Sequence, residues 1–133
     1  MRNILLLLSV ILLSSKGFAQ QESEPINFDP AFVHSVYFWL HNPDSAEDRN
    51  SFETALKELL MSSKYTKTNY IGTPPKSSRD VVDGSFTYNL LVTFESAEAQ
   101  EAYQVEDVHL KFIENAKHLW NKVVVYDATG LAE

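Results

Sequence analysis

The sequence of 133 residues contains no cysteine and only four glycines, and its 11 lysines and arginines are spread singly along the chain. Without cysteine, a disulfide scaffold and paired-cysteine metal sites are excluded. No glycine-rich phosphate-binding loop is present either. The 18 acidic residues give a net charge of −7, which argues against nucleic acid as a partner. With 44% hydrophobic residues the chain is not disordered, and its length predicts one small folded domain.

The first 19 residues have the pattern of a signal peptide. Arg2 precedes an apolar run over residues 4–13, and the small residues Gly17 and Ala19 lie at positions −3 and −1 of a cleavage site after Ala19. The run is well short of the roughly 20 residues that span a bilayer. We therefore predict a signal peptide over 1–19, export to the periplasm or the medium, and no membrane anchor after cleavage. A polar N-terminal segment over 20–30 would follow.

Residues 32–40 predict a strand that is apolar on both faces, because the stretch is rich in aromatic and β-branched residues and begins just past Pro30. Alternation places His34, Val36, Phe38 and Leu40 on one face and Val33, Ser35, Tyr37 and Trp39 on the other. Further strands are predicted at 64–72, at 86–94 and at 122–126, with the first of these at a sheet edge. In the 86–94 strand, Phe86 is expected on the same face as Tyr88. Residues 73–85, rich in proline and glycine, predict a long loop.

Helices are predicted between these strands. An apolar stripe spaced i, i+3, i+4, i+7 and i+8 indicates a helix after Asp44 or Ser45, formed by Phe52, Ala55, Leu56, Leu59 and Leu60. A short helix capped by Ser96 extends to about residue 103, and a second helical piece covers 107–119. The order β-α-β-β-α-β predicts an α+β, ferredoxin-like fold, a four-stranded antiparallel sheet with helices on one face. Tyr37 and Trp39 would then lie on the uncovered face, which predicts a homodimer interface.

Several short motifs carry a resemblance to a known family. They are His34-Ser-Val-Tyr-Phe, Tyr103 followed six residues later by His109, the spacing His109-x-x-Phe112, and the ending from Trp120 to Asp127. Together they resemble the stress-responsive A/B barrel family (Dabb, the dimeric α/β barrel domain) over roughly residues 31–128. The resemblance implies a ferredoxin-like protomer that dimerises through its sheet. It does not imply one activity, because such a fold hosts several functions.

Within this family, the residues resemble those of the plant olivetolic acid cyclase, which closes a polyketide without a cofactor. The resemblance implies that Tyr103 and His109 are the acid-base pair. It also implies a pocket between sheet and helices, which we expect to be lined further by His34, Phe38, Tyr88, Leu90 and Phe112. The sequence departs from the cyclase at Tyr88, where the cyclase has a histidine. It departs again at Glu106-Asp107, which replaces a His-Pro pair, so the cyclase substrate is not implied.

The residues alone support a similar but broader interpretation. His109 shares a helical stripe with Phe112, Ile113 and Ala116, so its imidazole points inward and burial lowers its pKa. A turn after Tyr103 would let the two side chains converge. His34 and His109 could instead be core histidines with structural hydrogen bonds, whereas His41 and His118 are expected to be solvent-exposed.

Three functions remain open at this point. The leading hypothesis is an exported homodimer that binds a small, partly apolar or aromatic molecule, with no cofactor and no metal site expected. The second is a cofactor-independent lyase or cyclase using Tyr103 and His109. The third is a structural, stress-protective dimer without a pocket, and cavity volume separates it from the other two.

Overall fold

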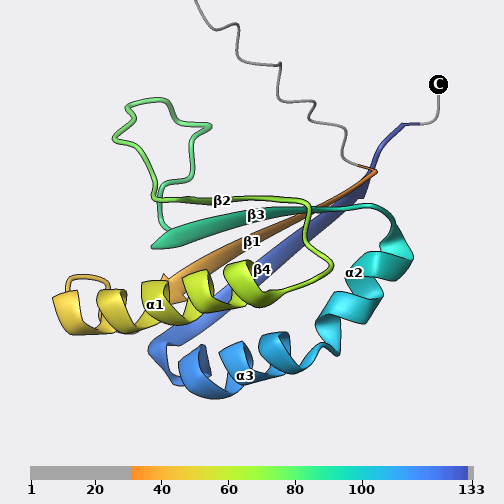
Figure 1. Cartoon of the computed structure of the whole chain (residues 1–133). Coiled ribbons are helices and arrows are strands. Elements are labelled where there is room, and N and C mark those ends of the chain that lie inside the picture. The colour runs from red at the N-terminus through yellow and green to blue at the C-terminus, as the bar shows by residue number, and fades with distance from the viewer. Residues whose placement is uncertain (1–30, 132–133) are drawn as a thin grey trace, which may run out of the picture.

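The computed structural model describes residues 31–131, so the predicted signal peptide and the polar segment lie outside the described residues. The elements are β1 (Phe32–Leu40), α1 (Ala46–Ser62), β2 (Thr68–Gly72), β3 (Tyr88–Phe94), α2 (Ala97–Gln104), α3 (Asp107–Ala116), the 3₁₀ turn η1 (Lys117–Leu119) and β4 (Trp120–Thr129). The strands form one sheet in the order β2-β3-β1-β4, and each neighbouring pair is antiparallel. All helices lie beneath one face of this sheet (Figure 1). The predicted ferredoxin-like α+β fold is confirmed.

Local sequence signals explain where the helices begin. The side chain of Ser45 accepts a hydrogen bond from the backbone N–H of Asp48, and Ser96 does the same for Ala99. Each serine therefore satisfies an amide that the first helical turn leaves unpaired. None of the helices within residues 31–131 is both long and apolar enough to cross a membrane.

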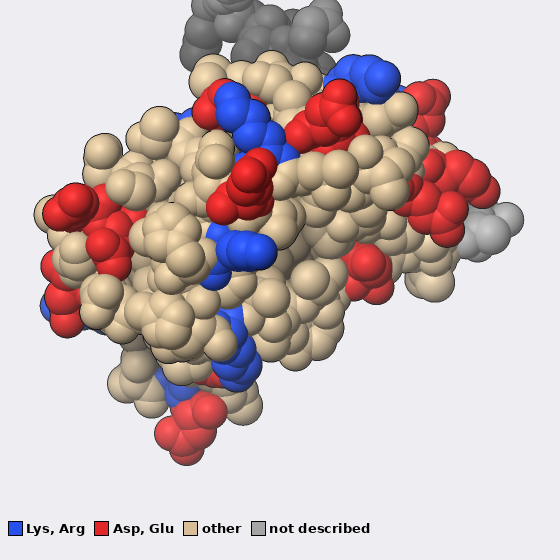
Figure 2. All heavy atoms as spheres, turned by 90° about the horizontal axis from the view of Figure 1, so that it is seen from below, with Lys and Arg blue, Asp and Glu red and all other residues tan. Residues whose placement is uncertain are grey.

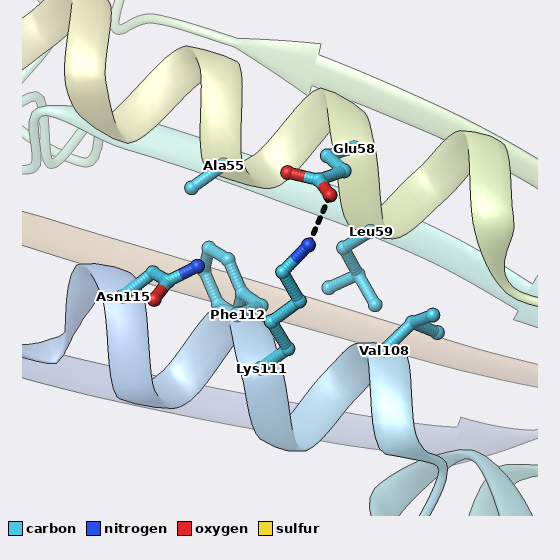
Figure 3. Close-up of a pocket in the computed structure, with 7 residues that line it drawn as sticks. All are labelled: Ala55, Glu58, Leu59, Val108, Lys111, Phe112 and Asn115. Atoms are coloured by element: carbon cyan, nitrogen blue, oxygen red, sulfur yellow. Dashed lines mark hydrogen bonds and ion pairs between the residues drawn. The ribbon is translucent and has the colours of Figure 1, made fainter.

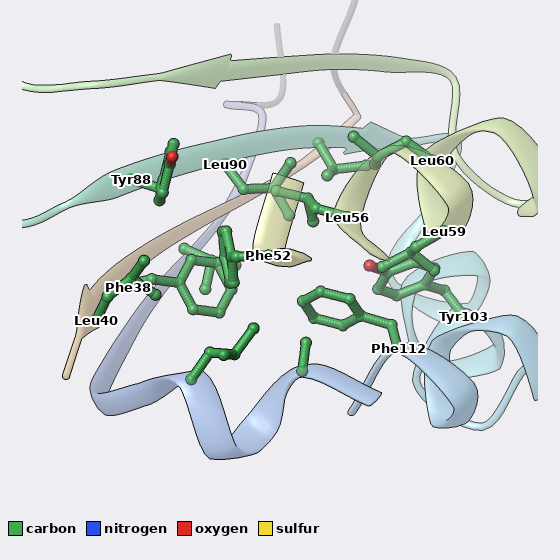
Figure 4. Packing of buried hydrophobic residues seen from close by; sticks show 14 of the residues in the cluster. Phe38, Leu40, Phe52, Leu56, Leu59, Leu60, Tyr88, Leu90, Tyr103 and Phe112 are labelled. Atoms are coloured by element: carbon green, nitrogen blue, oxygen red, sulfur yellow. The ribbon is translucent and has the colours of Figure 1, made fainter. Parts of the chain in front are cut away.

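The core lies between the sheet and the helices and is rich in aromatic rings (Figure 4). Phe52 of α1 is fully buried at its centre. Its ring stacks on Tyr88 at a centroid distance of 5.0 Å and meets the edge of Phe38 at 4.9 Å. Ring pairs at these distances add about 0.5–1.5 kcal/mol each beyond the area they bury. Phe52 thus joins α1 to both central strands.

No helix formed by residues 31–131 covers the opposite face of the sheet. The ring of Tyr37 contacts those of Phe86 and Tyr126 at 5.0 and 6.0 Å. The indole N–H of Trp39 donates to Ser85 Oγ at 3.1 Å, and the ammonium of Lys122 lies 4.1 Å from the centre of the indole. These side chains surround a hollow of about 260 Å³. Tyr37 and Trp39 therefore lie on the uncovered face, as predicted.

The predicted face of Phe86 is wrong. β3 begins only at Tyr88, and the alternation of faces breaks at Thr87. The N–H of Thr87 donates to the carbonyl of Phe38, while its hydroxyl accepts from the N–H of Leu40. Phe86 consequently packs on Tyr37, on the face opposite Tyr88. A hydrogen bond from a side chain that takes the place of a backbone bond between strands cannot be recognised from a pattern of hydrophobic residues. The alternation of residues therefore could not reveal this irregularity.

Candidate functional site

A cavity of about 180 Å³ lies between the sheet and the α2–α3 segment. One wall comes from β1, β3 and β4 and the other from the helices and Trp120. Its lining residues are His34, Val36, Phe38, Leu90, Tyr103, Gln104, His109, Phe112, Ile113, Trp120, Val123 and Val125. Most of this surface is apolar, and five of the side chains carry groups able to donate or accept hydrogen bonds, namely His34, Tyr103, Gln104, His109 and Trp120.

The hollow between α1 and α3 offers far less space. Its volume is about 20 Å³, and the ion pair between Lys111 and Glu58 lies at its rim (Figure 3). A water molecule needs roughly 10–15 Å³ on this measure, so this hollow has room for about one. On the helix side of the molecule, basic side chains are interspersed with acidic ones (Figure 2). Neither feature suggests a site.

His34 is held by a carboxylate from the neighbouring strand. In the β1–β4 register His34 lies opposite Asp127, and the two side chains are joined by a contact of 2.6 Å between Nδ1 and Oδ1. The carboxylate accepts, so Nδ1–H of His34 donates. This leaves Nε2 as the ring nitrogen available to a molecule in the cavity. His34 itself is buried, whereas the Asp127 side chain is partly open to solvent.

Tyr103 and His109 are brought together by the break between α2 and α3. α2 ends at Gln104, and the N–H of Glu106 donates to the carbonyl of Tyr103 in the turn that follows. The rings of Tyr103 and His109 lie 4.6 Å apart between centroids. His109 Nδ1 lies 3.1 Å from the carbonyl oxygen of Gln104 and donates to it, so its Nε2 keeps a lone pair. The predicted convergence of these two side chains is confirmed.

Burial sets the protonation of both groups. Desolvation lowers the pKa of His109 and outweighs the hydrogen bond to the Gln104 carbonyl, which favours the charged ring. Desolvation also raises the pKa of the Tyr103 phenol, and the negative charge of Glu106 raises it further. Near neutral pH the imidazole is therefore an acceptor and the phenol a donor. The Tyr103 side chain is only 1% exposed, and its hydroxyl forms no hydrogen bond with any described residue.

Glu106 lies beside this pair. Its Oε1 accepts from the backbone N–H of Lys64 at 3.1 Å, which ties the α2–α3 turn to the segment after α1. Its Oε2 is buried and has no hydrogen-bond partner among residues 31–131. The charge of Glu106 opposes the effect of burial on the pKa of His109.

Six of the seven predicted site residues line the same cavity. They are His34, Phe38, Leu90, Tyr103, His109 and Phe112. Tyr88, which we expected there too, is placed elsewhere: it lies under α1, in an open groove beside β2. Its hydroxyl donates to Glu53 Oε1 at 2.6 Å and the Arg49 guanidinium lies 4.9 Å from its ring centre. Burial and the Glu53 hydrogen bond raise the pKa of Tyr88 to about 12. Phe52 covers its ring on the side of the core.

Sequence reasoning missed part of the site. The residues it did not assign to the site are Val36, Gln104, Ile113, Trp120, Val123, Val125 and the His34 partner Asp127. Val36 could have been found, since alternation puts it on the His34 face. The β4 residues required the register with β1, which pairs Val36 with Val125 and Phe38 with Val123. Among residues 31–131, no three histidine, aspartate or glutamate side chains come together as a metal site.

Comparison with known proteins gives one family and several similar folds. The family model for the stress responsive A/B barrel domain (Dabb) matches residues 32–129. A Dabb family protein from Mesorhizobium loti, with a ferredoxin-like fold, is 15% identical with a TM-score of 0.65, and the match covers 78% of this chain and 100% of that one. The hydroxynitrile lyase of Passiflora edulis is 20% identical with a TM-score of 0.66, over 79% of this chain and 98% of its own.

A third similar structure is a dimeric ferredoxin-like protein of unknown function from Thermobifida fusca. It is 14% identical with a TM-score of 0.60, over 74% of this chain and 89% of its own. No curated protein sequence matches the chain. Likeness at these identities concerns the fold, whereas the family match spans most of the sequence. By that match over residues 32–129, the chain belongs to the stress responsive A/B barrel domain (Dabb) family.

Proposed function

We propose that the protein is an exported homodimer that binds a small, partly apolar molecule in the cavity between sheet and helices. The observation that carries the proposal is the combination of apolar walls with a few polar side chains. His34, Tyr103 and His109 all line the cavity of about 180 Å³. Ligand sites in proteins are mostly apolar, with a few polar groups that fix orientation.

The free atoms of these side chains support the proposal. Asp127 occupies one ring nitrogen of His34, and the Gln104 carbonyl occupies one of His109. In each ring the second nitrogen makes no hydrogen bond with a described residue. Among residues 31–131 the side-chain atom that is fully buried without a partner is Glu106 Oε2, so these nitrogens and the Tyr103 hydroxyl are accessible from the cavity. A ligand hydroxyl could donate to one of these nitrogens, and a carbonyl or hydroxyl oxygen could accept from the Tyr103 hydroxyl.

An NMR titration tests the binding function. We would add acetophenone and phenol separately to the chain from residue 20 onward and follow the ring protons of all four histidines. We expect shifts at His34 and His109, while the exposed His41 and His118 provide the internal control. Shifts of equal size at all four histidines, or none with either compound, would contradict binding in this cavity.

A second function, a cofactor-independent lyase or cyclase, is favoured by the contact between Tyr103 and His109. Neutral His109 could remove a proton from the carbon beside a carbonyl group. The electron pair of the broken C–H bond would move onto the carbonyl oxygen, and the Tyr103 hydroxyl would stabilise that oxygen by donating to it. A protein of the same fold, from Passiflora edulis, is a hydroxynitrile lyase.

Deuterium exchange separates catalysis from binding. We expect the protein to accelerate incorporation of deuterium from D₂O into the methyl group of acetophenone. His109→Gln should lose about 10²- to 10⁴-fold of that rate, the usual range for general base catalysis, while His118→Gln should not. Equal rates for wild type and His109→Gln would exclude the lyase or cyclase function with His109 as its base. Binding would then be the remaining function of the cavity.

The homodimer is proposed from the uncovered sheet face. Tyr37 and Trp39 lie there among other aromatic side chains. The similar proteins from Thermobifida fusca and Bacteroides fragilis are described as dimeric. Light scattering should give twice the mass of the chain at micromolar concentration, and Tyr37→Arg should reduce it to that of one chain. A single-chain mass for the unaltered protein would overturn this part of the proposal.

Export is proposed from the signal-like pattern of residues 1–19. After expression in a bacterium with the leader intact, N-terminal sequencing of the exported protein should begin at Gln20. Retention of the full chain in the cytoplasm would contradict the prediction. Arg2→Glu would serve as a matched variant, because it reverses the charge before the apolar run and should slow export.

A further inference from the structure

The cavity has a polar end and an apolar end. Along β1, His34, Val36 and Phe38 face it in succession. At about 3.3 Å per residue, roughly 13 Å separate His34 from Phe38. Because β4 is antiparallel, Val125 lies opposite Val36 and Val123 opposite Phe38. The strand wall therefore changes from a histidine to apolar side chains over that length.

The helix wall has the same polarity. The ring of Tyr103 lies 6.2 Å from that of His34, and His109 contacts Tyr103. Phe112 lies further along α3, where its ring stacks on Trp120 at 5.8 Å with an interplanar angle of 24°. Trp120 also meets Phe38 at 5.3 Å. The hydrogen-bonding groups of His34, Tyr103 and His109 are thus gathered at one end, and aromatic rings, with the indole N–H of Trp120 among them, form the other end.

One long side of the cavity is open. Val123 and Val125 belong to the edge strand β4 and point to the helix side, as their register with β1 shows. Although they face the helix layer, they remain 44% and 46% exposed. Valines that line a cavity and are half-exposed mark the place where it meets solvent. The neighbouring Val36, opposite Val125 on β1, is buried.

We propose that the ligand is a neutral, elongated amphipathic molecule, with a carbonyl or hydroxyl head at His34, Tyr103 and His109 and an unbranched apolar tail along Val125 and Val123. This inference rests on the proposed binding function and names its ligand class. The head is uncharged, because the protein carries a net charge of −7 and the neutral His109 provides no positive charge to hold an anion. Val125, midway along the open side, determines how long a tail is accepted.

A series of methyl ketones tests this proposal. Affinities of 2-pentanone, 2-heptanone, 2-nonanone and 2-undecanone would be measured by calorimetry. Burial of one methylene group contributes about 0.8 kcal/mol, so each two-carbon step should strengthen binding by up to about 15-fold. The gain should diminish once the tail passes Val123 into solvent. The methyl resonances of Val123 should shift with the longer ketones and stay unchanged with 2-pentanone.

Val125→Trp is the decisive variant, because the larger ring would block the open side. It should weaken the binding of 2-undecanone by more than about tenfold and that of 2-pentanone by a smaller factor, so that the gain in affinity with chain length is lost. Val81→Trp, at an exposed loop position, is the matched control. If Val125→Trp does not fold, Val123→Trp on the same open side gives the same test.

The outcomes distinguish the two levels of the proposal. Ketone binding without dependence on chain length, or an equal loss for all ketones in Val125→Trp, would overturn the amphipathic ligand and leave binding in the cavity intact. A failure of every ketone to bind, together with no histidine shifts for acetophenone and phenol, would overturn both. A length dependence that Val125→Trp removes would support both.

Discussion

Two buried tyrosines give a matched test of whether the cavity has an unused hydrogen-bond donor. Tyr103 and Tyr88 are 1% and 2% exposed. The hydroxyl of Tyr88 donates to the Glu53 carboxylate at 2.6 Å, whereas that of Tyr103 makes no hydrogen bond with a described residue. Replacement of each by phenylalanine removes one oxygen atom and little volume. The two variants therefore differ mainly in the hydrogen bond that is lost.

The two substitutions should have different effects on the melting temperature Tm. A hydrogen bond to a charged group contributes about 1.5–3 kcal/mol, and the partial exposure of Glu53 places Tyr88 at the lower end of that range. In a domain of this size, 1 kcal/mol shifts Tm by about 4–8 °C. Tyr88→Phe should thus lower Tm by roughly 6–12 °C. Tyr103→Phe should leave Tm unchanged or raise it by up to about 8 °C, because it removes a polar group that has no hydrogen-bond partner among residues 31–131.

Thermal unfolding followed by circular dichroism measures both variants, at pH 7 and at pH 3. The Tyr88→Phe effect should shrink at pH 3. The Tyr88 hydrogen bond lowers the pKa of Glu53, so its contribution is present above the ordinary carboxyl value and is lost as pH falls through the lowered one. If Tyr103→Phe lowers Tm as much as Tyr88→Phe at pH 7, the Tyr103 hydroxyl already has a partner. It could not then serve a ligand.

Three further predictions concern the site and the core. NMR titration of His109 should give a pKa below the ordinary value of about 6.5. The unfolded chain then binds the proton more tightly than the folded one, so the free energy of unfolding should rise with pH between the folded and the unfolded pKa of His109. His109→Gln should remove this dependence of stability on pH. Phe52→Ala should reduce the free energy of unfolding by about 3–5 kcal/mol in urea titrations, whereas Met61→Ala, at an exposed position, should change it by less than about 0.5 kcal/mol. Ile113→Phe should fill the cavity and weaken acetophenone binding at least tenfold, measured by calorimetry, with little loss of stability; unchanged binding would place the ligand elsewhere.

Much of the fold could be predicted because its signals are local. The strand at 32–40 was predicted with the bounds that the structure has, since its aromatic and β-branched residues and the proline before it are visible in the sequence. Ser45 and Ser96 are typical N-cap residues, and each marks the start of its helix in the sequence. The face of Phe86 could not be predicted, because it depends on hydrogen bonds between Thr87 and a strand distant in sequence.

The site was predictable to the extent that it lies on those elements. His34 and Phe38 share a strand face, and Tyr103 and His109 converge across a turn whose position the sequence indicates. The Asp127 contact was not predicted, although both residues were visible. It requires knowing that β4 lies beside β1 and in which register, which is a property of the whole sheet. Tyr88 was misplaced because its strand face was known but the helix covering it was not.

The presence of the cavity helps to distinguish the three candidate functions. Cavities in cores reduce stability by about 24 cal/mol per Å³, so a closed void of about 180 Å³ would cost about 4 kcal/mol. The opening at Val123 and Val125 admits water and reduces that cost, but Tyr103 and His109 still lose the packing that apolar residues would give them. A domain typically has only about 5–15 kcal/mol of stability. A dimer with a purely structural role gains nothing from such a space, whereas a ligand that fills it and meets its polar atoms would offset the loss. The cavity therefore favours the two functions that need an occupant.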